Sequence, residues 1–212
     1  MLENAGLRFQ CIASDVDESI PSDIESEEVP LYLARVKAQA VAVKVPNAVV
    51  IGADQIALHR GRILRKPRTA REARDQLAAL SGSAHELVTG AVVLEPLARR
   101  RPDMERGGPS PSAGGKAGSE DRRNASSRKD GDRGGHAVVT RATLSFRTLD
   151  AGLIDAYVAT GEWQGCVGGY RLEGRGVLLM EHFSGDYFSI LGLPLVEVLG
   201  LLRRVGVDPL RP

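Results

Sequence analysis

The chain has 212 residues, which suits one domain, and 42% of them are hydrophobic, enough for a core. With 28 basic and 27 acidic residues the net charge is +1, so charge gives no whole-molecule argument for a nucleic-acid or membrane partner. No stretch approaches the roughly 18 apolar residues of a membrane helix, and the first six residues lack the basic flank and apolar run of a signal peptide. Cys11 and Cys166 are too few and too far apart for a disulfide framework or a zinc–thiolate site. We therefore expect a soluble cytoplasmic protein.

The first part of the chain predicts alternating strands and helices. In chain order they are a short strand at 8–12, an acidic connector through Glu28, a helix from Pro30 to about Val43, a buried strand at 48–51 that continues at 56–58, a hairpin turn at 59–62, and a helix that starts at Thr69 and stops at Gly82. The helix that starts at Thr69 begins with a capping box, in which Glu72 follows Thr69 by three residues.

Residues 98–135 differ from the rest of the chain. They include no Val, Ile, Leu, Phe, Tyr, Trp or Cys, and they carry ten basic and six acidic side chains. Such a segment cannot bury enough apolar area to offset the entropy of ordering it, so we interpret it as a disordered insertion within a single domain spanning 1–212. A nucleic-acid-binding arm is the less favoured alternative, because the segment has no aromatic residue to stack on a base.

The insertion separates two predicted strands, 86–94 and 137–146, and the simplest topology joins them as a hairpin with an expanded turn. The remaining predicted elements are a helix capped by Asp150 and ending near Ala159, a strand at 177–180, and a helix at 194–204 with Leu195, Val198, Leu199 and Leu202 facing inward. Imperfect alternation of strands and helices predicts an α/β fold with a mixed central sheet flanked by helices.

Several polar residues stand beside apolar segments. Asp54 directly follows a buried-strand pattern, and a carboxylate there requires a partner, a metal ion or water; it is a candidate metal ligand or general base, or else a turn residue. Lys66 precedes a capped helix, where anions commonly bind, and Lys37 lies in a nearly apolar helix.

Two further features could contribute to a phosphate site. Asp15, Asp17 and Glu18 could hold Mg²⁺ through oxygen ligands, although such a run is more often solvated. The glycine-dense residues 168–176 allow the backbone to approach a ligand closely. There is no phosphate-binding P-loop, dinucleotide fingerprint, nucleophile elbow or zinc-type histidine spacing. Together the carboxylates, the lysines and the glycine loop are the parts that a Mg²⁺–polyphosphate site needs.

An ordered set of short motifs resembles the Maf family of nucleoside triphosphate pyrophosphatases. The set is Asp17-Glu18, Lys37-Ala38, Gly52-Ala53-Asp54-Gln55, Ile63-Leu64-x-Lys66-Pro67, Leu80-Ser81-Gly82, Thr89-Gly90, Phe146-Arg147, Gly168-Gly169-Tyr170, Glu173-Gly174, Gly185-Asp186-Tyr187 and Gly192-Leu193-Pro194-Leu195. The resemblance covers residues 6–97 and 137–206. It implies a two-lobed α/β fold with a cleft, often dimeric, and hydrolysis of a nucleoside triphosphate to the monophosphate and pyrophosphate.

By motif position the resemblance also implies roles for individual residues. Asp54 matches the residue that activates water, Glu18 matches an acidic residue that helps hold a divalent metal ion, Mg²⁺ or Mn²⁺, together with Asp54, and Lys37 and Lys66 match lysines on the phosphates. These roles are physically consistent, because cations neutralise phosphate charge and a carboxylate orients water.

The base-binding residues implied by the resemblance are Gln55 and Glu173. They favour the branch of the family that acts on 7-methyl-GTP, because a carboxylate suits the positive charge of a methylated base. Gly169-Tyr170 resembles the dTTP/UTP branch, which is the alternative.

The family's opening strand and its Ser/Arg-bearing phosphate loop have no counterpart in the printed sequence, so the resemblance also predicts an N-terminal truncation or a misplaced start. Three functions follow as hypotheses. The favoured one is an active pyrophosphatase, the second is a nucleotide-binding member with little turnover, and the third is a nucleic-acid-binding protein that uses residues 98–135.

Overall fold

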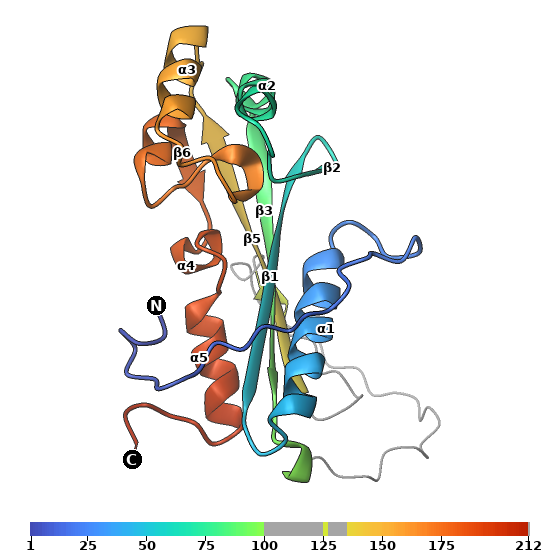
Figure 1. Ribbon diagram of the computed structural model, residues 1–212. Coiled ribbons are helices and arrows are strands. Elements are labelled where there is room, and N and C mark those ends of the chain that lie inside the picture. Colours follow the sequence, from blue (N-terminus) through green and yellow to red (C-terminus); the bar gives the residue numbers. More distant parts are fainter. Residues whose placement is uncertain (100–124, 127–134, 212) are drawn as a thin grey trace, which may run out of the picture.

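The computed structural model describes residues 1–99, 125–126 and 135–211 and centres on one β-sheet (Figure 1). The strands are β1 (Val50–His59), β2 (Arg62–Leu64), β3 (Ala84–Leu94), β4 (Ala125–Ser126), β5 (Gly135–Phe146) and β6 (Met180–Ser184). Their order is β2-β1-β3-β5-β4, and β6 pairs with the other end of β5. Every ladder among these strands is antiparallel.

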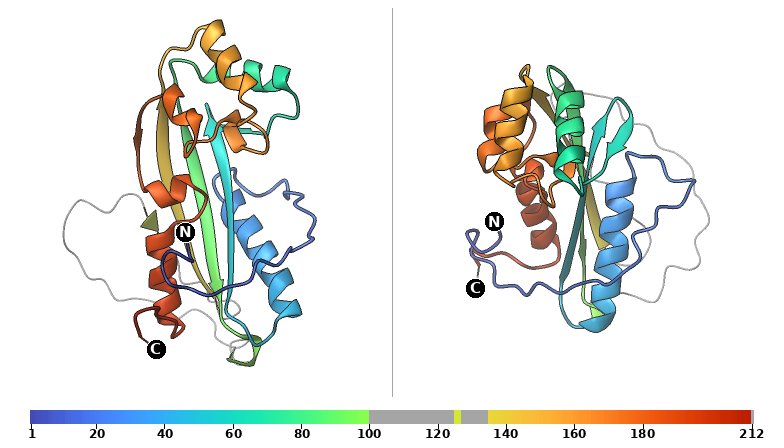
Figure 2. Two further views of the ribbon diagram at one scale, coloured as in Figure 1. Left: turned by 60° about the vertical axis from the view of Figure 1, so that its left-hand side comes forward. Right: turned by 45° about the horizontal axis from the view of Figure 1, so that its top comes forward.

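In the described part of the chain, five α-helices and three short 3-10 turns surround the sheet. The helices are α1 (Val29–Lys44), α2 (Ala70–Leu80), α3 (Ala151–Ala159), α4 (Tyr187–Ile190) and α5 (Leu195–Arg204), and the turns are η1 (Leu97–Arg99), η2 (Val167–Gly169) and η3 (Arg175–Leu179). At one end of the sheet α1 covers one face and α5 the other, while α2 and α3 lie together at the opposite end (Figure 2). Among the described helices none combines the length and the apolar character needed to cross a bilayer.

The period-two alternation of β3 explains why two helices can sandwich the sheet. Val88, Val92 and Leu94 point to the face that α1 covers, and Ala91 and Val93 point to the face that α5 covers. A strand with apolar residues on both faces is buried on both sides. The continuous hydrophobic run of β3 therefore belongs to the middle of the sheet.

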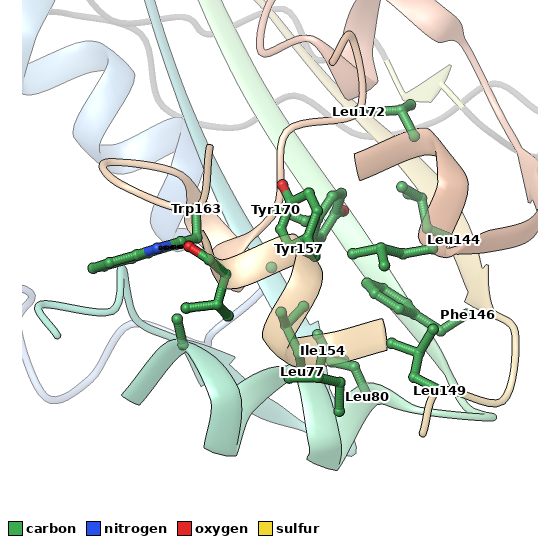
Figure 3. Packing of buried hydrophobic residues seen from close by; sticks show 14 of the residues in the cluster. Leu77, Leu80, Leu144, Phe146, Leu149, Ile154, Tyr157, Trp163, Tyr170 and Leu172 are labelled. Carbon is green, nitrogen blue, oxygen red and sulfur yellow. Dashed lines mark hydrogen bonds between the residues drawn. The ribbon is translucent and has the colours of Figure 1, made fainter. Parts of the chain in front are cut away.

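The opposite end of the sheet has its own core (Figure 3). Leu77 and Leu80 of α2 pack with Leu144 and Phe146 of β5, with residues of α3, and with Tyr170. The ring of Tyr170 meets that of Phe146 edge-on, with centroids 5.3 Å apart, an arrangement that aromatic pairs favour. This packing holds the segment that follows α3 against the sheet.

Two glycines allow α1 to lie directly on the sheet. A Cβ atom on Gly52 of β1 would lie 2.4 Å from the carbonyl oxygen of Ala34, and one on Gly90 of β3 would lie 2.5 Å from the backbone nitrogen of Leu31. Any side chain at either position would force the helix away from the strands. This close approach brings the helix residue Lys37 to the level of Asp54.

The predicted helix ends and turns are confirmed. The Thr69 side chain accepts a hydrogen bond from the Glu72 amide, and the Asp150 side chain accepts one from the Leu153 amide. Each of these satisfies a backbone donor that the helix itself leaves free. The β1–β2 hairpin turns through Arg60 and Gly61, both with positive φ, as two-residue hairpin loops require. The hairpin of β3 and β5 also forms, with Leu94 opposite Gly135.

Other predictions are wrong in detail. Residues 8–12 form no strand and are exposed, and the strand predicted at 177–180 is mostly the 3-10 turn η3, with β6 beginning only at Met180. The fold is α/β, with a central sheet flanked by helices, as predicted. The sheet was expected to be mixed, but its described ladders are all antiparallel. In α5, Leu195, Val198 and Leu202 are buried as predicted, Leu199 is partly buried against the same core, and Leu201 is buried in addition.

The predicted disordered insertion, 98–135, lies almost entirely outside the described residues. Of its described positions, Ala98 and Arg99 end the turn η1, Ala125–Ser126 pairs with β5 as β4, and Gly135 begins β5.

Candidate functional site

A pocket of about 510 Å³ opens between the middle of β1 and the segments 165–173 and 190–192. All six site residues predicted from the sequence line this pocket: Glu18, Lys37, Asp54, Gln55, Lys66 and Glu173. The structure therefore brings together residues that come from the connector before α1, from α1, from β1, from the segment after β2, and from the segment after α3.

The pocket contains a cluster of one lysine and two carboxylates. The Lys37 ammonium lies 2.5 Å from Asp54 Oδ1 and 2.9 Å from Glu18 Oε1. The Asp54 side chain is 14% exposed and that of Lys37 23%, whereas Glu18 is 57% exposed. Asp54 lies inside β1 rather than at its end, and it is the close approach of α1 at Gly52 that supplies its cation.

Burial and charge act in opposite directions on this cluster. Burial disfavours the charged ammonium of Lys37, but the hydrogen bonds and negative charges of Asp54 and Glu18 outweigh it and raise the pKa of Lys37. Burial raises the pKa of the Asp54 carboxyl, and the contact with Lys37 offsets part of that effect. An Asp54 with a raised pKa is a better proton acceptor than a solvated aspartate.

Lys66 follows β2 and precedes Pro67 and the capped start of α2. Its side chain is exposed, and it makes no ion pair with any residue in the described part of the chain. Its charge nevertheless lowers the pKa of Asp54 slightly, against the larger effect of burial. The pocket thus holds one paired lysine and a second whose charge faces solvent.

Only one residue of the acidic run 15–18 reaches the pocket. Asp15 pairs with Lys44 at 3.1 Å, and Asp17 accepts hydrogen bonds from Ser19. The Lys44 ammonium also donates to the Ala13 carbonyl. Lys37 and Lys44 are two helix turns apart on α1, so the same side of the helix fixes the connector at two points.

Gln55 is tied into a buried polar network. Its amide nitrogen donates to Thr89 Oγ1 at 2.8 Å and to the Ser189 carbonyl at 2.7 Å. Ser189 in turn receives a hydrogen bond from Thr140 and donates to Asp186. The two protons of the Gln55 amide are therefore used by the protein, and its carbonyl oxygen is the part of the side chain left for a ligand.

Glu173 lies at the edge of the pocket and is paired. Its carboxylate accepts a hydrogen bond from the Arg171 guanidinium at 3.1 Å, and its side chain is 46% exposed. Arg171, which lines the same pocket, was not singled out from the sequence. Neither were Thr89 and Ser189, although Thr89 belongs to one of the quoted motifs.

The donor set fits a divalent cation in part. Carboxylate oxygens are the ligands that Mg²⁺ and Mn²⁺ prefer, and Asp54 and Glu18 converge on one point that a positive charge, the Lys37 ammonium, already marks. Within residues 1–99 and 135–211, no group of three His, Cys, Asp or Glu side chains is placed to hold a metal ion. A metal ion held by these two carboxylates would keep positions for water or for substrate oxygens.

Comparison of the chain with known families identifies its family. A family model described as "Maf-like protein" matches residues 1–107 and 124–205. The chain belongs to the Maf family.

Curated relatives cover nearly the whole chain. A protein named dTTP/UTP pyrophosphatase from Moorella thermoacetica is 35% identical over 208 residues, which is 98% of this chain and 90% of the relative. Proteins of the same name from Geobacillus sp. and Pyrococcus furiosus are 32% identical over 97% of this chain and 31% identical over 90% of it, and the matches cover 91% and 81% of those relatives. These names favour the alternative substrates, dTTP and UTP, over 7-methyl-GTP.

Proposed function

We propose that this protein hydrolyses dTTP and UTP to the nucleoside monophosphate and pyrophosphate. The observation that carries the proposal is the Lys37–Asp54–Glu18 cluster, which lies in the pocket of a chain that belongs to the Maf family. Each of the relatives described above is itself named dTTP/UTP pyrophosphatase. No comparable observation favours the hypothesis of a nucleotide-binding member with little turnover or the nucleic-acid-binding hypothesis.

The proposed reaction is the attack of water on the α-phosphorus with pyrophosphate as the leaving group. Asp54 is positioned to orient the water and accept its proton, because it is shielded from solvent and its pKa is raised by burial. Lys66 faces solvent at the edge of the pocket and stabilises the charge that develops on the leaving phosphates. A divalent cation bound with the nucleotide would neutralise phosphate charge and polarise the phosphorus–oxygen bonds.

The Gln55 network is compatible with a base that donates a hydrogen bond from a ring nitrogen, as thymine and uracil do. Since the amide protons of Gln55 are used by Thr89 and Ser189, its free carbonyl oxygen can accept a hydrogen bond, and thymine and uracil both offer a donor at N3. The Glu173 carboxylate is neutralised by Arg171 and offers no free negative charge to a methylated guanine. This pairing is one reason for proposing a pyrimidine, and the base-binding role of Glu173 stays a prediction.

The test is pyrophosphate release from dTTP, UTP, CTP, GTP and 7-methyl-GTP in the presence of Mg²⁺ or Mn²⁺. We expect kcat/KM for dTTP and UTP to exceed the others by roughly tenfold or more. Asp54→Asn should lower kcat by about 10²–10⁴-fold, the range associated with loss of a general base. Asp75→Asn is the matched control, because Asp75 is an exposed carboxylate of α2 outside the pocket.

A folded wild-type protein that releases pyrophosphate from none of the five nucleotides would refute the proposal and support the nucleotide-binding hypothesis. Preference for 7-methyl-GTP would refute only the base assignment. Retained activity in Asp54→Asn would remove Asp54 from its proposed role and leave the substrate assignment standing.

A further inference from the structure

The position of Lys37 has a consequence for how a metal ion enters the pocket. We propose that the Lys37 ammonium holds the place of the divalent cation in the nucleotide-free protein, and that it leaves the two carboxylates only when metal and nucleotide bind together. This inference rests on the proposed function, because the phosphates of the substrate give Lys37 its second position.

The geometry makes lysine and metal alternatives rather than neighbours. The ammonium is within 3 Å of both Asp54 Oδ1 and Glu18 Oε1, and Mg²⁺ would need to approach the same oxygens to about 2.1 Å. A divalent ion and an ammonium sharing these two oxygens would repel each other strongly in a partly buried pocket. The ammonium must therefore move before the ion can bind both carboxylates.

The charges of the described residues set the order of events. Two carboxylates and one ammonium leave the cluster with one net negative charge, which attracts a divalent ion only weakly. A nucleoside triphosphate brings three to four negative charges, enough to accept both the metal ion and Lys37. The metal ion and the nucleotide then raise each other's affinity, because each one favours the same displaced position of the lysine.

Lys37 also organises the empty site. Glu18 belongs to the connector before α1, which has no regular secondary structure there, and its side chain is more than half exposed. The contact with Lys37 keeps this carboxylate beside Asp54 without a metal ion. The lysine is thus a positioning residue for the second carboxylate in the free protein and a phosphate ligand in the complex.

The test measures binding of Mn²⁺ alone, with no nucleotide, by the loss of the free-ion electron paramagnetic resonance signal. We expect wild-type protein to bind Mn²⁺ with a Kd weaker than about 1 mM. Lys37→Met and Lys37→Gln should each bind it at least roughly tenfold more tightly, because they free both carboxylates. The double variant Lys37→Met/Asp54→Asn should lose that gain.

The matched control is Lys66→Met. It removes the same charge from the same pocket without touching either carboxylate, so its Mn²⁺ affinity should stay within about threefold of wild type. An equal gain in both lysine variants would show a general field effect and overturn the proposal.

One outcome remains decisive even when a Lys37 variant fails to fold. A wild-type protein that binds Mn²⁺ alone with submillimolar affinity contradicts the proposal directly. Conversely, failure of the inference is distinguishable from failure of the proposed function: pyrophosphate release by wild type without a Lys37 effect on Mn²⁺ refutes only the inference, and the Lys37 effect without pyrophosphate release refutes only the function.

Discussion

His85 is a buried titratable residue at the end of the sheet opposite α1. It is 2% exposed, and its Nε2 atom shares a hydrogen bond with the Tyr170 hydroxyl at 2.8 Å. Burial lowers the pKa of His85 to about 4. Its ring packs against both Phe146 and Tyr170, so a charge on His85 would be introduced into an aromatic core.

This environment predicts a loss of stability in mild acid. The folded state holds the neutral ring down to about pH 4, whereas the unfolded chain takes up a proton near pH 6.5. Stability is therefore full above pH 6.5 and falls as the pH drops toward 4. Between pH 7 and pH 5 the free energy of unfolding should fall by about 2 kcal/mol through this residue alone.

Urea unfolding of wild type and His85→Gln at pH 7 and pH 5 checks this expectation. The glutamine variant is less stable at pH 7, but it should lose about 2 kcal/mol less on acidification than wild type. His182→Gln, which changes an exposed histidine of β6, is the control and should behave as wild type. Equal losses in all three proteins would show that His85 is not responsible.

Residues of the candidate site could be predicted from the sequence only where they belong to the family motifs. Those motifs placed Asp54, Lys37 and Glu18 in one site, and the structure brings them within 3 Å of one another through Lys37. The partners of Gln55 could not be foreseen, because Ser189 is 134 residues away in the chain. Such a contact depends on the tertiary packing of α4 against the sheet, which no local pattern encodes.

At the scale of elements, α1 positions the site by lying unusually close to the strands. The helix was predicted from its pattern and found within one residue at each end. Its closeness is set by Gly52 and Gly90, whose missing side chains admit the helix backbone. Because Lys37 belongs to this helix and Asp54 to the strand beneath it, the helix–sheet distance also determines the ion pair.

We therefore expect Gly52→Ala to affect both stability and activity. The new Cβ would lie 2.4 Å from the Ala34 carbonyl oxygen, so α1 must shift away from β1. The free energy of unfolding should fall by about 1–3 kcal/mol, as in other overpacked cores, and kcat for dTTP should fall as Lys37 moves from Asp54. Urea unfolding and pyrophosphate release measure the two effects.

Gly200→Ala is the matched control for this substitution. Gly200 lies in α5, and a Cβ atom there would meet no heavy atom within 4 Å. The change should leave kcat as in wild type and raise the free energy of unfolding by up to about 1 kcal/mol, because alanine favours a helix. A Gly52→Ala protein as stable as Gly200→Ala would show that α1 accommodates the methyl group.

Long elements with clear periodicity were predicted correctly, and most of the errors fall on short ones. The hairpin of β3 and β5 has apolar strands of eleven and twelve residues, and a pattern of that length is unambiguous. The segments 8–12 and 177–180 are only a few residues long, and the four-residue helix α4 has no periodicity to read. For such pieces tertiary contacts, rather than the local sequence, select the conformation.

At the scale of the whole molecule, residues 98–135 connect the ends of β3 and β5 that lie away from the pocket. Leu94 pairs with Gly135 at the end of the β3–β5 hairpin, whereas Asp54 pairs with Gly90. Four residues of extended strand, roughly 13 Å, separate the two levels. Both ends of the segment therefore join the sheet at the end where η1 lies. Its residues Ala125–Ser126 pair with Thr140 and Val139 of β5, on the side of β5 away from the strand that carries Asp54.

Replacing residues 100–134 with a six-residue Gly/Ser linker should leave the enzyme active. We expect kcat/KM for dTTP to stay within about threefold of wild type, because surface connections tolerate changes of length and the two residues of β4, which the replacement removes, pair with β5 on the side away from β1. Pyrophosphate release by the shortened protein measures this, and a loss beyond tenfold would place part of the segment in the site. The same variant tests the nucleic-acid hypothesis, which requires steeply salt-dependent binding that the replacement abolishes.

The predicted homodimer stays a prediction, and sedimentation equilibrium of the full chain measures it.

The unbroken ladder of β1, β3 and β5 also determines which parts of the molecule can move. Asp54, Gly90 and Val139 pair in one row across the sheet at the level of the pocket, and pairing continues on both sides of that row. In the described part of these three strands, pairing continues without a break between the two ends of the sheet. We therefore expect adjustment to a bound nucleotide to come mainly from the irregular segments at the rim, above all the connector that carries Glu18. The sheet would then hold the site residues in place, and the segments at its edges would adapt to the substrate.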